Sequence, residues 1–263
     1  MTTWLANTRV MTRRNLVHVR REPMQLSDVT IQPVLFVFLF VYVFGAAMHI
    51  PGGTYVDFAI AGLLTLNLTT ASVGTAVGLS TDLSTGITDR FRTLPIARSS
   101  VLIGRSISDL LASTLAATLV LITGWVIGWR PDSSLPSVVA GILVVLLFAY
   151  AMSWASACLG IASQGPEAAQ GIAFIAFFPL SFVSNAFVPT QGMPQWLETI
   201  ANWNPVSAVT ASVRVLFGNP NPSGTIDTWP MQHPTQAALL WSFAFLAVFV
   251  PLAIRGYRRK TTD

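Results

Sequence analysis

Apolar residues gather into six long stretches that are separated by short polar segments. Each stretch is close to the roughly 20 residues that a helix needs to cross a bilayer. Apolar and polar residues do not alternate with a period of two within them, which disfavours a β-barrel. The sequence therefore predicts an all-helical integral membrane protein with six spans. The predicted spans are residues 31–50, 58–80, 106–129, 137–161, 168–188 and 236–254.

The composition agrees with a membrane protein. Of the 263 residues, 52% are hydrophobic and 10% are charged, and the mean hydropathy is +0.61. A soluble domain carries about 25% charged residues. The single cysteine, Cys158, excludes a disulfide within the chain.

Basic residues are distributed unequally along the chain. All except Arg130 and Arg214 fall in the N-terminal segment, in the segment between spans two and three, or in the C-terminal tail. Because cytoplasmic segments carry the excess of Lys and Arg, these three segments and both termini are predicted to be cytoplasmic in a multi-pass protein of the cell membrane. Tryptophans gather near the opposite, outer ends of the spans, as is typical of a membrane interface. They are Trp125, Trp129, Trp196, Trp203, Trp229 and Trp241.

The N-terminal segment, residues 1–28, is predicted to be a separate cytoplasmic helix before a transmembrane domain at 29–263. Its apolar side chains can share one stripe with arginines beside it, and Pro23 ends the pattern. This is typical of a basic amphipathic helix on an anionic leaflet. Two roles stay open, simple anchoring and contact with a partner protein.

Span two concentrates the polar side chains that lie within the membrane. They are Thr65, Asn67, Thr69, Thr70, Ser72 and Thr75. Hydrogen bonds between helices are their expected role, and contact of Asn67 and Thr70 with a substrate is the alternative. Phe178 in span five is a further candidate for a substrate pathway.

Two small-residue patterns and one charged pair also fall in the spans. Gly74 with Gly78, and Gly124 with Gly128, form GxxxG patterns that favour close helix packing. The third span carries Arg105 and Asp109 one helical turn apart near its inner end. These two side chains are expected to pair or to reach the membrane surface.

Several functional classes are disfavoured by what the sequence lacks. The only lysine is Lys260, so the chain has no GxxxxGK[ST] phosphate-binding loop and is not expected to hydrolyse nucleotide. No acid, histidine or lysine lies in the middle of a span, which disfavours an ion-coupled carrier. The histidines are far apart and form no HExxH motif, so neither a catalytic nor a metal site is expected. The basic segments flank membrane spans and therefore indicate anionic lipid rather than nucleic acid.

The segment STGITDRFRTLPIARSS, residues 84–100, interrupts the apolar pattern on the predicted cytoplasmic side. Ile87, Phe91 and Leu94 follow the spacing i, i+4, i+7 and form one apolar helix face, and Pro95 ends the helix. This face either packs on the protein's own membrane base or enters a groove of a soluble partner.

The stretch DRFRTLPIARSSVLIGRSISD resembles a signature of ABC type-2 exporter permeases, in particular the bacterial daunorubicin-resistance permease family. That signature reads E-R-(L/F)-R-(T/S)-L-P-(I/V)-(S/A)-R, followed by Gly-Arg/Lys and an acidic residue. Asp89 stands where glutamate is commoner in the family. The matching residues are Arg90, Phe91, Arg92, Thr93, Leu94, Pro95, Ile96, Ala97, Arg98, Gly104, Arg105 and Asp109.

A second stretch, residues 184–217, predicts two short helices on the outer face. Pro194 opens the first helix, in which Trp196, Ile200 and Trp203 share one face. The second helix begins at residues 204 and 205, an Asn N-cap followed by Pro at the first helical position. Arg214 in the second helix is expected to pair with Glu198 or with a lipid phosphate.

This outer stretch resembles the family pattern A-F-V-P-x-x-x-M-P-x-W-L followed by N/Q-P before the last span. The matching residues are Ala186, Phe187, Val188, Pro189, Met193, Pro194, Trp196, Leu197, Asn204 and Pro205. The two short helices are interpreted as re-entrant helices over the exit. The candidate outer gate consists of Phe187, Pro189, Trp196, Asn204 and Pro205.

The resemblance implies a permease that works with two copies of a separate P-loop ATPase, which would carry ATP and Mg while this chain carries no cofactor. The segment 84–100 would be its coupling helix and residues 1–28 its interface helix. The implied ATPase-docking residues are Ile87, Asp89, Arg90, Phe91, Arg92, Leu94, Arg13 and Arg14. Six spans would be half of a transporter, completed by a second copy or a homologous permease, for a hydrophobic or amphipathic small molecule such as a drug, polyketide or lipid. A membrane receptor or assembly subunit without transport activity is the alternative.

Overall fold

The computed structural model describes residues 23–48, 50, 52–85 and 98–260. Within these ranges the regular structure is helical and no β-strand occurs, as the sequence predicts. The coupling helix and residues 1–22 of the N-terminal segment, both expected from the sequence to be helical, lie outside the described residues, whereas residues 23–28 begin α2.

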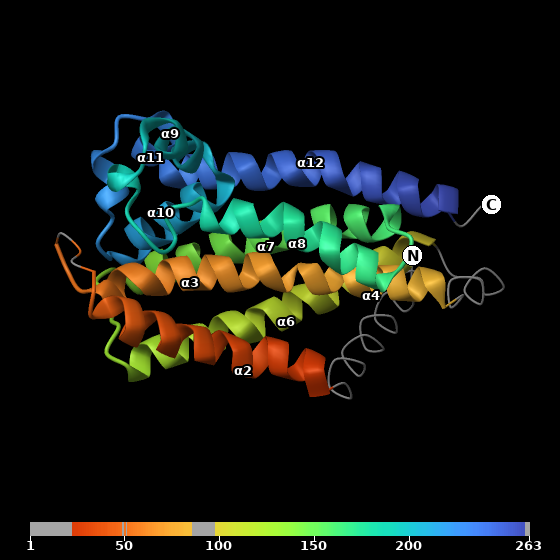
Figure 1. The fold of residues 1–263 in the computed structure, drawn as a ribbon, viewed down its shortest axis with the longest axis horizontal. Coiled ribbons are helices and arrows are strands. Elements are labelled where there is room, and N and C mark those ends of the chain that lie inside the picture. Colours follow the sequence, from red (N-terminus) through yellow and green to blue (C-terminus); the bar gives the residue numbers. More distant parts are fainter. Residues whose placement is uncertain (1–22, 49, 51, 86–97, 261–263) are drawn as a thin grey trace.

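Helical passes run back and forth between the two ends of an elongated bundle (Figure 1). In the described residues they are α2 (Pro23–Leu39) with the π-helical turn η1 (Phe40–Phe44), α3 (Tyr55–Ala71) with α4 (Val73–Ser84), α6 (Arg98–Val126), α7 (Leu135–Ala162), α8 (Pro166–Phe182) and α12 (Pro234–Lys260). At one end, called here the basic end, α4 stops, α6 and α8 begin, and α12 finishes with Arg258, Arg259 and Lys260.

The opposite end, called here the α9–α11 end, is built from short helices between α8 and α12 (Figure 1). They are η2 (Thr190–Gly192), α9 (Gln195–Trp203), α10 (Pro205–Phe217), η3 (Pro222–Thr225) and α11 (Trp229–Gln232). Both helices predicted for residues 184–217 are therefore present as α9 and α10.

Not every predicted span is a long helix. Among the described residues, four helices are long and apolar enough to cross a membrane, namely Tyr55–Ser84, Leu102–Val126, Leu135–Ala162 and Pro234–Lys260. The predicted spans 31–50 and 168–188 are shorter, because the first ends in a turn after Phe44 and the second ends at Phe182. Side chains that bind the backbone beyond Phe182, described below, account for the early end of α8.

Helix α7 lies at the centre and packs on α12, α4, α10 and α6. Small residues on α7 let its neighbours approach closely, as is common between membrane helices. At Gly160, an added Cβ would lie 2.4 Å from the carbonyl oxygen of Ala76 on α4. On one side of the bundle α2, α3 and α8 lie side by side, with α3 between the other two (Figure 1).

Candidate functional site

Phenylalanine rings connect α8 to the end of the first helical pass. Phe174, Phe178 and Phe182 occupy successive turns of α8, with ring centroids 4.8 and 4.2 Å apart. Phe187, beyond the helix, continues the series at 5.3 Å from Phe182 and stacks on Phe40 of η1 at 4.4 Å. We call these five residues the aromatic ladder. It brings together Phe178 and Phe187, which the sequence assigned to different parts of the pathway.

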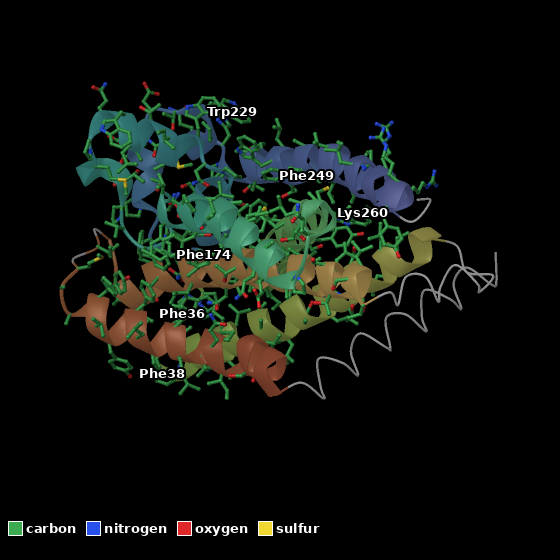
Figure 2. All side chains as sticks on the ribbon, turned by 45° about the vertical axis from the view of Figure 1, so that its right-hand side comes forward. Phe36, Phe38, Phe174, Trp229, Phe249 and Lys260 are labelled. Atoms are coloured by element: carbon green, nitrogen blue, oxygen red, sulfur yellow. The ribbon has the colours of Figure 1, made fainter. Side chains whose placement is uncertain are left out.

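The aromatic ladder is exposed along α8 and buried where it meets η1. Phe178 is 41% exposed, whereas Phe40 and Phe187 are each 8% exposed. Helix α2 presents further exposed apolar side chains, including Leu35 and Phe38. Figure 2 shows Phe174 on α8 and Phe36 on α2, with Phe38 on the side of α2 away from the bundle. Each of these two helices thus carries apolar and aromatic side chains that the described residues leave exposed.

The row of polar side chains predicted for span two begins on α3, which lies between these two helices, and ends with Thr75 on α4. Its hydrogen bonds differ from the expectation. The hydroxyls of Thr65, Thr69 and Thr70 and the amide of Asn67 donate to carbonyls of their own helix. In the described residues, only Thr75 bonds another helix from this row, with Oγ1 donating to Asp109 Oδ2 at 2.8 Å. The predicted interhelical bonds are therefore wrong for the rest of the row, because a helix carbonyl one turn back is always within reach.

The two polar candidates for the substrate pathway differ in exposure. Asn67 is 6% exposed and its side-chain amide donates to the Leu63 carbonyl at 2.8 Å. Thr70 is half-buried beside the exposed residues Ala71 and Gly74. Thr70 is therefore the better placed of the two to meet a ligand.

Asn204 joins the end of α8 to the start of α10. Its Oδ1 accepts from the backbone N–H of Val206 at 2.8 Å, which is the predicted N-cap, and Pro205 occupies the first turn of α10. Its Nδ2 donates to the carbonyls of Leu180 and Val183 at 2.7 and 2.5 Å. One amide thus satisfies both helix termini, which explains why the outer-gate candidates Asn204 and Pro205 lie next to the segment that carries Phe187.

Arg214 on α10 holds the same segment from the other side. Its guanidinium is fully buried, with Nε donating to the Phe58 carbonyl at 3.0 Å and Nη2 donating to the carbonyls of Asn185 and Ala186 at 2.9 and 3.2 Å. The guanidinium carbon also lies 3.6 Å from the centroid of the Phe58 ring. In the described residues no carboxylate pairs with it. The predicted pairing with Glu198 or a lipid phosphate is therefore wrong. Three backbone carbonyls accept hydrogen bonds from the guanidinium instead, and the Phe58 ring makes a cation–π contact with it.

Irregular residues 183–189 are thus held by side chains rather than by a helical ladder. The backbone N–H of Asn185 donates to Ser207 Oγ at 3.0 Å, and the hydroxyl of Tyr55 donates to the Phe187 carbonyl at 3.4 Å. Buried backbone groups need such partners, so these bonds allow α8 to end six residues before the predicted boundary at 188.

Helix α9 carries a separate aromatic surface. Trp196, Ile200 and Trp203 are exposed on one face, at the predicted spacing. In the described part of the chain no ring contact joins Trp196 to the aromatic ladder, whereas Phe187 belongs to the ladder and Pro189 precedes η2. The outer-gate candidates therefore fall on two surfaces.

The predicted ATPase-docking residues belong to two segments of the chain, residues 1–28 and 84–100. Ile87, Asp89, Arg90, Phe91, Arg92, Leu94, Arg13 and Arg14 all lie outside the described residues. Helices α4 and α6 flank the segment 86–97 at the basic end. Among the residues that the structure describes, no group of His, Cys, Asp and Glu is suited to a metal ion.

Sequence reasoning gave Arg214 the wrong partners and missed most of the aromatic ladder. The signal for the ladder was the spacing of Phe174, Phe178 and Phe182 at i, i+4 and i+8. The signal for Arg214 was a lone charge within the apolar helix Pro205–Phe217, which has no acid in its first turn. A charge in such a helix needs a buried polar partner, and backbone carbonyls qualify.

Comparison with known proteins agrees with this architecture. The ABC-2 type transporter family matches residues 6–217. The daunorubicin resistance ABC transporter permease protein DrrB1 of Streptomyces coeruleorubidus is 34% identical over 94% of this chain and 84% of its own length. The probable doxorubicin resistance ABC transporter permease protein DrrC of Mycobacterium tuberculosis is 27% identical over 98% and 91%. A putative transport permease, ycf38 of Porphyra purpurea, is 26% identical over 80% and 73%. The chain therefore belongs to the ABC-2 type transporter family and is a multi-pass membrane permease.

Proposed function

We propose that this permease exports an aromatic, amphipathic small molecule from a bacterial cell, driven by a separate ATPase. The observation that carries the proposal is the aromatic ladder on the α2–α8 side of the bundle. Aromatic rings stack favourably with planar aromatic ligands. Daunorubicin and doxorubicin, named in the relatives, are ligands of this chemical class.

The proposed orientation places the basic end in the cytoplasm and the α9–α11 end outside. It rests on the basic residues that close α12 and on the exposed tryptophans of α9 at the other end. All six passes would cross the membrane, with the short α2 and α8 facing the centre of the transporter. Both termini would then be cytoplasmic, with residues 1–28 as the interface helix.

A second copy of the chain, or a homologous permease, would face the α2–α8 surface in the cell membrane. The exposed parts of the aromatic ladder would then line a slit between protomers, with Thr70 as its polar contact from α3. Phe187, Asn204 and Pro205 would form the outer gate, since they join the end of α8 to α10. In this arrangement neither protomer encloses the pathway alone.

Residues 86–97 would transmit the motion of the ATPase to the permease. Two P-loop ATPase subunits would bind ATP and Mg, and this chain would contribute no catalytic residue or cofactor. Their closure would push Ile87, Phe91 and Leu94, and the first, second and fifth passes would rock to release substrate outward. The resemblance of this segment to the family signature supports the assignment.

We expect the substitution Phe91→Asp to abolish association with the ATPase. A charge in the centre of an apolar docking face removes the contact that dominates such an interface, so the amount of co-purified ATPase should fall on the order of tenfold or more. The measurement is a pull-down of the P-loop ATPase partner, with membrane insertion of the permease checked in parallel.

Thr93→Asp is the matched control, because it adds the same charge to the polar side of the same predicted helix. It should leave the pull-down near the wild-type level. Unchanged association of the Phe91→Asp variant, or equal losses in both variants, would remove the coupling-helix assignment.

A further inference from the structure

A charged cluster joins α4 to α6 at the basic end, next to residues 86–97. The Arg105 guanidinium of α6 lies across α4, where Nη2 donates to the Gly74 carbonyl at 3.1 Å. Its Nη1 lies 3.6 Å from Asp82 Oδ2, and its Nε lies 3.9 Å from Asp109 Oδ2. Asp109 in turn accepts the hydrogen bond from Thr75 described above. The cluster therefore links α6 to α4 at Gly74, Thr75 and Asp82, over a little more than two helical turns.

The two glycines of α4 play different parts in this contact. A Cβ added at Gly78 would lie 2.0 Å from Arg105 Nη2, so the guanidinium occupies the space that a side chain would take. A Cβ added at Gly74 would meet nothing within 4 Å. The sequence predicts that this GxxxG pattern brings helices together. Instead, Gly78 leaves room for the Arg105 guanidinium, which we call the arginine seat, and Gly74 faces open space.

Apart from the charged cluster, the described residues of α4 and α6 share an apolar cluster at this end, in which Leu79 of α4 and Leu102 of α6 pack together with residues of α7 and α12. Helix α4 packs mainly on α7 and α8 and touches α6 at few positions. The chain between the two helices is the segment that carries the predicted coupling helix. A link between α4 and α6 here decides whether a push on that segment moves both helices or only one.

We propose that Arg105, seated on Gly78, is a positioning residue that makes α4 and α6 move together when residues 86–97 are displaced. The displacement then reaches α3, which directly precedes α4 in the chain. Helix α3 carries Thr70 and packs on both α2 and α8. This inference rests on the proposed function, in which an ATPase displaces that segment. The link itself is a property of the permease alone.

The first test measures the link without any transport. Spin labels at Thr85→Cys on the end of α4 and Ile107→Cys on α6 sit at exposed positions, in a background in which Cys158→Ala removes the only native cysteine. Double electron–electron resonance then gives the distribution of distances between them. We expect one narrow distribution for the parent and for Gly74→Ala, and a broader or shifted one for Gly78→Ala and Arg105→Ala.

The second test uses the complex with its ATPase and daunorubicin as the probe. Gly78→Ala should keep the ATPase bound and leave basal ATP hydrolysis unchanged, while drug-stimulated hydrolysis falls by about tenfold. A merely structural defect would instead lower the yield or the thermal midpoint. The double variant Gly78→Ala, Arg105→Ala should be no worse than either single variant, because the arginine has already left its seat.

The outcomes separate the two proposals. If the distance distributions of all variants coincide, or if Gly74→Ala disturbs them as much as Gly78→Ala, the arginine seat is refuted. If the distributions differ as expected but the wild-type complex shows no drug-stimulated hydrolysis, the link stands and the proposed function falls. If stimulation exists and Gly78→Ala retains it, the link does not transmit the motion.

Discussion

Replacing Arg214 by alanine should lower the stability of the permease more than any other loss of a single arginine in the described residues. The substitution leaves a cavity and removes the donors for the carbonyls of Phe58, Asn185 and Ala186. Buried carbonyls without partners and a cavity together should cost more than about 3 kcal/mol. In a detergent-solubilised sample, the thermal midpoint should therefore fall by about 10 °C.

Two companion variants separate the causes. Arg214→Met fills most of the cavity but donates no hydrogen bond, so it should recover only part of the loss. Arg130→Ala is the matched control, because Arg130 also stacks on a ring, that of Trp125 at 4.1 Å, and also donates to backbone carbonyls, but it is exposed. Its loss should stay within about 1 kcal/mol. Equal midpoints for the two alanine variants would show that Arg214 does not hold residues 183–189.

Replacing Gly62 by alanine should be nearly as damaging. A Cβ at Gly62 would lie 1.9 Å from the carbonyl oxygen of Ala186 and 2.6 Å from its carbon. These are backbone atoms, so relief requires the whole segment 183–189 to move away from α3. Since Arg214 binds the same Ala186 carbonyl, the displacement also weakens that hydrogen bond, and the expected loss is about 3 kcal/mol.

The measurement is again the thermal midpoint in detergent. Gly171→Ala on α8 serves as the control, because a Cβ there would meet nothing within 4 Å and alanine favours a helix by about 1 kcal/mol over glycine. The control should be neutral or slightly stabilised. A Gly62→Ala variant as stable as this control would mean that the segment does not pack against α3 as closely as described.

Much of the fold follows from patterns that depend on local physics. Long apolar stretches predict the helices from 55 to 84, 102 to 126, 135 to 162 and 234 to 260, because a membrane helix must satisfy its own backbone. Asn204 and Pro205 correctly predict the start of α10, because an N-cap side chain binds a backbone N–H only two or three residues away.

The features that the sequence did not predict depend on contacts between distant residues. Helix α8 ends early because side chains of Asn204, Ser207 and Arg214 replace helical hydrogen bonds. These residues lie more than twenty positions further along the chain than the backbone groups that they bind. Gly78 belongs to a GxxxG motif that is typical of close helix packing. The position of Arg105 in the structure shows that this glycine makes room for a side chain instead. Likewise, the spacing on α8 indicates stacked rings but not their continuation to Phe40.

If ATP drives an aromatic molecule along the aromatic ladder, inside-out vesicles that contain the permease and its ATPase should take up daunorubicin. Uptake should require ATP and should fall by about tenfold in Phe178→Ala, which removes an exposed ring of the ladder. Phe243→Ala removes an even more exposed ring, 58% exposed, from α12 and should leave uptake unchanged. Uptake that a proton gradient drives without ATP would refute the ATP-driven export. Equal losses in both variants would refute the role of the aromatic ladder.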